Sequence, residues 1–70
     1  MKAGEHVWLM SYGDVIIQRR IVSVGELHVY VTTDDEYDAA LREDREPVAI
    51  GFRLSEVVGV GDTLNIEARK

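Results

Sequence analysis

Residues 15–33 contain the pattern that most constrains how this chain can fold. The run Val15–Val24 (VIIQRRIVSV) is rich in β-branched side chains, which favour extended backbone. Gly25-Glu26 follows, and glycine at the first central position is typical of a two-residue type II′ turn. Leu27–Thr33 then alternates between apolar and polar residues. We therefore predict a β-hairpin whose second strand buries one face, formed by Leu27, Val29 and Val31.

Shorter strand patterns lie on both sides of this hairpin. His6–Met10 predicts a strand before it, and Val48–Leu54 predicts one after it, with Gly51 as a bulge or bend. Ser55–Val58 fits either one helical turn or the start of another strand, and Thr63–Ala68 alternates again. Together these segments predict a mainly β domain with one short helix: a strongly bent five-stranded antiparallel sheet or a small barrel.

The helix is expected between the third and fourth strands, at about residues 34–43. The segment Thr33–Glu36 fits a capping box, with threonine at the N-cap and glutamate at N3. Apolar residues follow at helical spacing, so we expect Tyr37 and Leu41 to dock the helix on the sheet. Glu46-Pro47 ends the segment, because the residue before proline avoids helical angles.

The composition fits one folded domain spanning residues 1–70. The chain is 46% hydrophobic and 30% charged and has one proline, which argues against disorder. The absence of cysteine excludes a disulfide framework and a thiolate metal site. No apolar run approaches the roughly 20 residues of a membrane span, and the first residues lack a secretory signal. We expect a soluble cytoplasmic domain that does not enter a membrane.

Two short motifs are similar to those of a known group of small barrels. Gly4–Trp8 (GEHVW) resembles the "G-(D/E)-x-V-x" opening of barrels of the Src-homology, Tudor and KOW type. Phe52–Val58 resembles the single helical turn that leads into their last core strand. The resemblance implies a small β-barrel that serves as a binding module more often than as an enzyme. The acidic helix and the strand-like tail after Gly61 depart from the family's pattern.

Patterns that carry chemistry are lacking. His6 and His28 lie on separate strands without metal-ligand spacing. The acidic run from Asp34 lacks the glycine and glutamate of an EF-hand loop. Gly59-Val60-Gly61 lacks the third glycine and the following helix of a dinucleotide fingerprint. No serine stands in a nucleophile motif. We therefore predict no catalytic residue, no cofactor and no metal.

The net charge of −5 arises in one segment of the chain. Residues 34–46 contain seven acids and two arginines, while the rest of the chain has six acids and six bases. This segment repels a phosphate backbone. It is either a solvated helix face or a docking surface for a basic partner, including one that normally binds nucleic acid. We expect a protein partner to contact Asp34, Asp35 and Asp38, with a homodimer as a further option.

Aromatic and arginine side chains supply the other candidate contacts. Val7 and Leu9 form an aliphatic face, so Trp8 points the other way. Trp8 is therefore either a partner anchor or a cap on one end of the core. We also expect Tyr30 and Arg20 to contact the partner.

A second hypothesis is a nucleic-acid-binding barrel of the KOW or Tudor kind. Arg19 and Arg20 point to opposite faces of one strand, and Arg20 is expected beside Tyr30 or His28. Aromatic and arginine side chains on one sheet face stack unpaired bases. The local excess of acids makes nucleic acid the less favoured partner.

Overall fold

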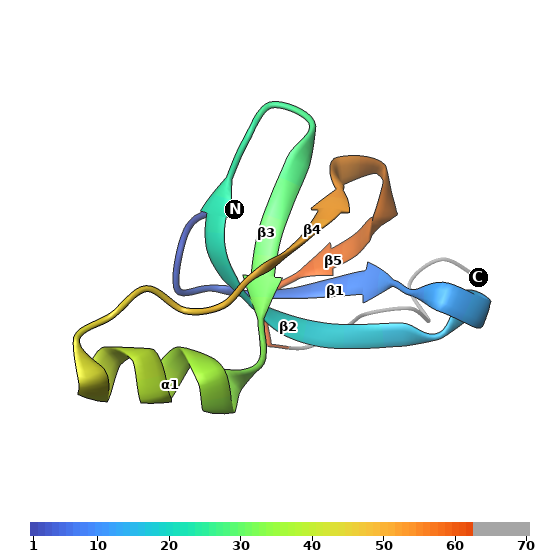
Figure 1. Cartoon of the computed structure of the whole chain (residues 1–70). Helices are drawn as coiled ribbons and strands as arrows, with labels where there is room; N and C mark the ends of the chain where they lie inside the picture. Colours follow the sequence, from blue (N-terminus) through green and yellow to red (C-terminus); the bar gives the residue numbers. More distant parts are fainter. Residues whose placement is uncertain (63–70) are drawn as a thin grey trace.

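The computed structural model describes residues 1–62, which form one bent antiparallel sheet and one α-helix (Figure 1). In chain order the elements are β1 (His6–Met10), the 3-10 turn η1 (Tyr12–Asp14), β2 (Ile16–Val24), β3 (His28–Thr32), α1 (Asp34–Glu43), β4 (Ile50–Arg53), the 3-10 turn η2 (Leu54–Glu56) and β5 (Val57–Val60). The strand order is β4-β3-β2-β1-β5. The predicted mainly β fold with a helix between the third and fourth strands is confirmed. The sheet is not closed into a barrel, and β4 and β5 are its edges.

The β2–β3 hairpin is confirmed, but its turn differs from the prediction. Val24 pairs with Val29, and the amide of Gly25 donates to the carbonyl of His28 at 2.7 Å. Gly25 does not adopt a positive φ, so the turn is not type II′. Leu27 lies in the loop and is 73% exposed, so the prediction that it is buried is wrong. The alternation of buried residues begins only where β3 begins, at His28.

The core lies on one face of the bent sheet. Its five buried residues are Val7, Leu9, Ile21, Val29 and Val31, and Ile17, Phe52, Leu54 and Val57 pack against them. The register shifts between Ile21 and Ser23 on β2, and between Trp8 and Leu9 where β1 pairs with β5. Such irregularities increase local twist and help the sheet to curve around its own apolar face. Val7 and Leu9, the aliphatic face predicted for the first strand, both belong to this core, so that prediction is confirmed.

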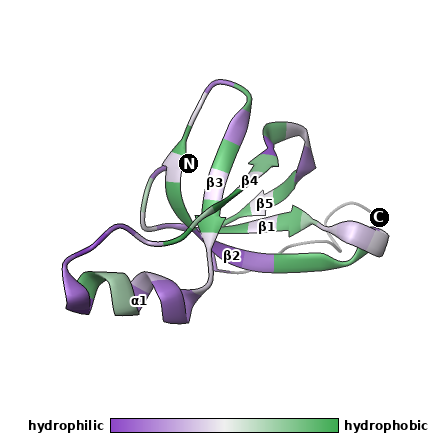
Figure 2. Cartoon of the chain, in the orientation of Figure 1, coloured by the Kyte–Doolittle hydropathy of each residue, from purple (hydrophilic) through white to green (hydrophobic). Residues whose placement is uncertain are grey.

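Helix α1 begins as predicted, but it docks differently. The Thr33 hydroxyl accepts the Glu36 amide at 3.1 Å, and Asp44 ends the helix in a left-handed conformation with φ 53°. Ala40 is the buried residue of the helix. Leu41 is 68% exposed, so the prediction that it docks the helix is wrong. Figure 2 shows hydrophilic residues at both ends of α1 and hydrophobic residues concentrated in the strands.

The chain after α1 resolves two further expectations. Ser55–Val58 was open between a helical turn and a strand, and both are present: η2 leads directly into β5. The β3–β4 register runs through Gly51 without a shift, so this glycine forms no bulge. The predicted strand Thr63–Ala68 lies outside the described residues. No helix within residues 1–62 is long and apolar enough to cross a membrane.

Candidate protein-interaction surfaces

Asp34, at the start of α1, is bound by two basic side chains from the sheet. Its carboxylate lies 2.9 Å from Nε2 of His6 on β1 and 3.2 Å from a terminal nitrogen of Arg20 on β2. Desolvation, the largest single effect, raises the pKa of Asp34, but the hydrogen bonds and charges of Arg20 and His6 together outweigh it. The pKa of Asp34 is therefore below its ordinary value. This predicted partner contact is already used to hold the helix to the sheet.

Glu36 is also engaged within the chain. It accepts a hydrogen bond from Arg45 at 2.6 Å and another from the amide of Val48 at 2.9 Å. The hydrogen bond from Arg45 is the main reason that the pKa of Glu36 lies below its ordinary value, followed by that from Val48. Arg45 also binds Glu43 at 2.7 Å. These contacts fasten the segment before β4 to the helix.

Asp35 and Asp38 differ from the acids around them. Both are exposed on α1; Asp38 lies three residues after Asp35 and four residues before Arg42, a spacing that puts them on one side of the helix. No ion pair of either carboxylate is present within residues 1–62, and the spacing of Asp38 and Arg42 gives no contact within 4.0 Å. Asp35 and Asp38 are therefore the two carboxylates of α1 that make no ion pair with residues 1–62.

The two arginines of β2 point to opposite faces, as predicted, but Arg20 has different neighbours from those expected. It pairs in register with His6 and Thr32 rather than lying beside Tyr30 or His28. Its Nε donates to the carbonyl of Gly4 at 2.7 Å, and its guanidinium lies 4.5 Å from the ring centre of Tyr37. The expected position beside Tyr30 was wrong, because the register pairs Tyr30 with Ser23, three residues further along β2 toward the hairpin loop.

Trp8 lies on the sheet face opposite the core and is half-buried. Its indole nitrogen donates to the carbonyl of Gly61 at 3.1 Å. Gln18, paired with Trp8, reaches the carbonyl of Asp62 at 3.3 Å. The Asp62 carboxylate binds Nδ1 of His6 at 2.8 Å. The indole nitrogen of Trp8, a candidate partner contact, therefore binds the residues directly after β5.

Tyr30 is 41% exposed and covers a glycine on the neighbouring strand. A Cβ added to Gly51, its register partner, would lie 3.1 Å from Cε1 of the Tyr30 ring. The ring also lies 6.3 Å from that of His28, centre to centre. The structure thus places the three candidate contacts Trp8, Arg20 and Tyr30 on one face of the sheet, but Arg20 and Trp8 are engaged by the chain itself.

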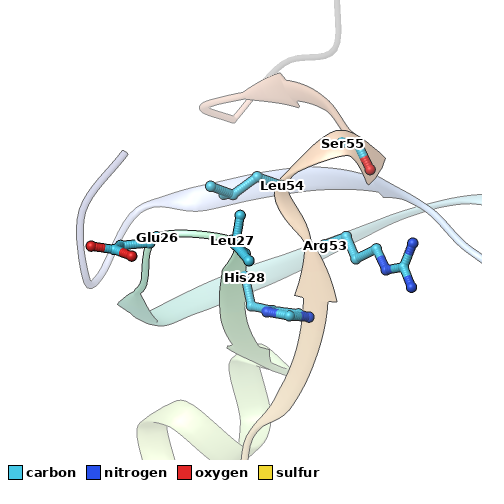
Figure 3. Close-up of a pocket in the computed structure, with 6 residues that line it drawn as sticks. All are labelled: Glu26, Leu27, His28, Arg53, Leu54 and Ser55. Atoms are coloured by element: carbon cyan, nitrogen blue, oxygen red, sulfur yellow. The ribbon is translucent and has the colours of Figure 1, made fainter.

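Three concave regions lie on the described surface, and the smallest, of about 200 Å³, lies between α1, β2 and the segment after the helix. A pocket of about 410 Å³ lies between the β2–β3 loop and η2, and Figure 3 shows Leu27 and Leu54 near each other within it while the Glu26 and Arg53 side chains point away on opposite sides. A second hollow of about 300 Å³, the β2–β4 groove, is lined by Ser11, Ile17, Arg19, Val31, Thr32, Thr33, Val48, Ile50 and Phe52.

Reasoning from the sequence missed the contacts that join distant segments. His6 and Asp34 are 28 residues apart, and neither belongs to a motif that pairs them. Within residues 1–62 no three His, Asp or Glu side chains are arranged to hold a metal ion. Comparison of the chain with protein-family models, with curated proteins and with solved structures finds no match.

Proposed function

We propose that this chain is a non-catalytic protein-interaction module that docks a basic protein surface through the exposed ridge of α1. The observation that supports this most is the difference between neighbouring acids. Asp34 and Glu36 are engaged by Arg20, His6 and Arg45, whereas Asp35 and Asp38 are exposed without an ion pair within residues 1–62. Two exposed carboxylates on a fixed helix give a partner a defined arrangement of negative charge.

The way in which the helix is held adds to this support. Thr33 caps its first turn, and Arg20 and His6 bind its first residue. Glu36 fixes its other side to the approach to β4 through Val48. A rigid presentation lowers the conformational entropy that is lost on binding. Partly exposed Tyr30 and fully exposed Tyr12 provide aromatic contact area elsewhere on the surface.

The alternative function, nucleic-acid binding, has weaker support. Arg19 and Arg20 lie on opposite faces of β2, so they do not contribute to one basic surface. Arg20 already binds Asp34, Gly4 and Tyr37. Heparin chromatography separates the two hypotheses: elution below about 0.3 M salt agrees with the protein proposal, and later elution favours several phosphate contacts.

Affinity capture with the immobilised full chain tests the proposal. Extracts of the native host, treated with nuclease, are passed over the wild type and over a variant that combines Asp35→Lys and Asp38→Lys. A matched variant combines Glu26→Lys and Glu46→Lys, two exposed acids outside α1 with the same total change of charge. We expect a protein that the wild type and the matched variant retain and the helix variant loses.

Two further measurements complete this test: the fold of each variant and the salt dependence of capture by the wild type. Circular dichroism of both variants is expected to match that of the wild type, because all four carboxylates are exposed. Capture by the wild type is expected to weaken as salt rises, since exposed charges are screened. Equal loss of capture in both variants would show a non-specific charge effect, and undiminished capture by the helix variant would contradict the proposal.

A further inference from the structure

The β2–β4 groove leaves part of the apolar face open to solvent. Val31 is 2% exposed and pairs in register with Ile50, which is 67% exposed. Val48, just before β4, is 73% exposed and lines the same groove. The core face is therefore shielded from solvent at Val31 on β3 and exposed to solvent at Ile50 on β4. A hollow that continues a core and exposes neighbouring aliphatic side chains is typical of an interaction site.

The groove also contains one cation. Arg19 is the single charged side chain among the described residues that line it. Its guanidinium donates to the carbonyl of Gln18 at 2.8 Å, and no carboxylate of residues 1–62 lies within 4.0 Å of it. Guanidinium has five donors in a fixed fork, which matches the two oxygens of a carboxylate. The charge complementary to this groove is therefore a single carboxylate.

The backbone of β4 adds a third feature, a free strand edge. The amide of Leu54 donates to Leu27 next to β3, so by strand alternation the amides of Gly51 and Arg53 point to the other side. The Glu56 carboxylate accepts the Arg53 amide at 2.9 Å. Within residues 1–62, Gly51 has no such side-chain cap and β3 is the only strand that pairs with β4. An incoming strand can bind at this edge.

We propose that the β2–β4 groove binds an extended segment of a partner protein in which an apolar residue and an Asp or Glu stand two positions apart. The segment adds to the free edge of β4. Side chains two positions apart share one face of a strand, so the apolar side chain packs against Ile17 and Ile50 while the carboxylate binds Arg19. This surface lies on the opposite face of β2 from α1, and the proposal does not depend on docking by the acidic helix.

Peptide selection with the full chain tests this proposal. The probe is an immobilised positional-scanning library of short peptides, acetylated and amidated so that the ends carry no charge, and it is exposed to the labelled wild-type chain. We expect selection of an aliphatic residue with Asp or Glu two positions away. Failure to select any peptide, or a preference for basic residues, would overturn the proposal.

A matched pair of arginine variants then tests the role of Arg19. The best selected peptide is compared with its counterpart containing Gln in place of Glu, by fluorescence anisotropy. We expect the Glu peptide to bind the wild type at least about tenfold more tightly, and Arg19→Gln to remove that difference. Arg42→Gln, an exposed arginine on α1, is expected to leave it unchanged. An unaltered preference in Arg19→Gln, with its fold confirmed by circular dichroism, would contradict the proposal.

Two further measurements distinguish strand addition from other ways of filling the groove. Methylation of the peptide nitrogens whose N–H faces β4 is expected to abolish binding. Methylation of the intervening nitrogens, whose N–H points away from β4, is expected to leave binding unchanged. Equal effects of the two sets of methylations would contradict pairing with the β4 edge. A concentration-dependent dimer that Ile50→Thr disrupts, together with no peptide binding, would assign the groove to a second copy of the chain and overturn the proposal.

Discussion

The guanidinium of Arg20 lies 4.5 Å from the ring centre of Tyr37 and joins β2 to the first turns of α1. The same side chain binds Asp34 on the helix and the carbonyl of Gly4 before β1. This residue of β2 thus contacts two segments that are distant from it in sequence, α1 and the chain before β1. Because Ala40 is small and Leu41 is exposed, we infer that this cluster contributes to the orientation of the acidic helix.

Replacement of Arg20 is expected to loosen the helix. Arg20→Ala removes the cation–π contact, an ion pair with a half-exposed carboxylate and a hydrogen bond, and we expect the free energy of unfolding to fall by about 1–2 kcal/mol. Urea denaturation followed by circular dichroism measures this change. Arg42→Ala is the control and should change the free energy by less than about 0.5 kcal/mol. Equal effects of the two substitutions would mean that Arg20 does not organise the helix.

Val29 and Leu27 test the corrected boundary of β3. Val29 is fully buried, so Val29→Asp places an unpaired charge in the core and is expected to unfold a domain that holds only about 5 kcal/mol. Leu27→Asp alters an exposed loop residue and should leave the fold intact. The dispersion of amide proton signals in NMR spectra separates these outcomes. Unfolding of the Leu27→Asp variant would contradict this boundary, because it would indicate that Leu27 is buried, as its place in the alternation predicted.

The effect of a substitution at Gly51 is expected to depend on the ring of Tyr30, its register partner on β3. A Cβ at position 51 would lie 3.1 Å from Cε1 of that ring, which must then move. We expect Gly51→Ala to destabilise the wild type by about 1 kcal/mol. In a Tyr30→Ala background the same change should be neutral or stabilising, because alanine loses less backbone entropy than glycine. A double-mutant cycle measured by urea denaturation gives the coupling, and additive effects would contradict this contact.

Acid is expected to weaken the attachment of α1. The pKa values of Asp34 and Glu36 lie below their ordinary values of 3.8 and 4.5. Their ionised forms therefore stabilise the folded chain above those ordinary values, and this contribution is lost as the pH falls through the folded-state pKa values. We expect the free energy of unfolding to decrease between about pH 5 and pH 2. Glu36→Gln should reduce that dependence, and Glu26→Gln in the exposed loop should not.

The sequence predicts the local structure well, because its signals are local. Alternation in residues 29–32 and β-branched residues in β2 predict the paired strands, and Thr33 with Glu36 predicts the start of α1. Leu27 shows the limit of this reasoning: it continues the alternation by one residue into a loop. The hydrogen bonds of the hairpin set that boundary, and no single residue type specifies them.

The candidate surfaces depend on contacts that the sequence does not encode locally. The charge count predicts an acidic segment, but it does not separate engaged Asp34 from exposed Asp35, since the partners of Asp34 come from β1 and β2. Likewise, Arg19 and Ile50 meet in one groove only because the sheet is bent and β4 lies at its edge. In a closed barrel the two edge strands would pair, whereas here β4 and β5 remain the edges of an open sheet. Whether the edges meet depends on the twist summed over all strands.

Amide mapping of the isotope-labelled chain with the protein captured by the wild type tests the central proposal most directly. We expect the strongest changes in NMR signals in residues 34–42, centred on Asp35 and Asp38, and we expect them to disappear when both residues are changed to Lys. Changes confined to other parts of the chain, with the amides of α1 unaltered, would contradict docking through the acidic helix.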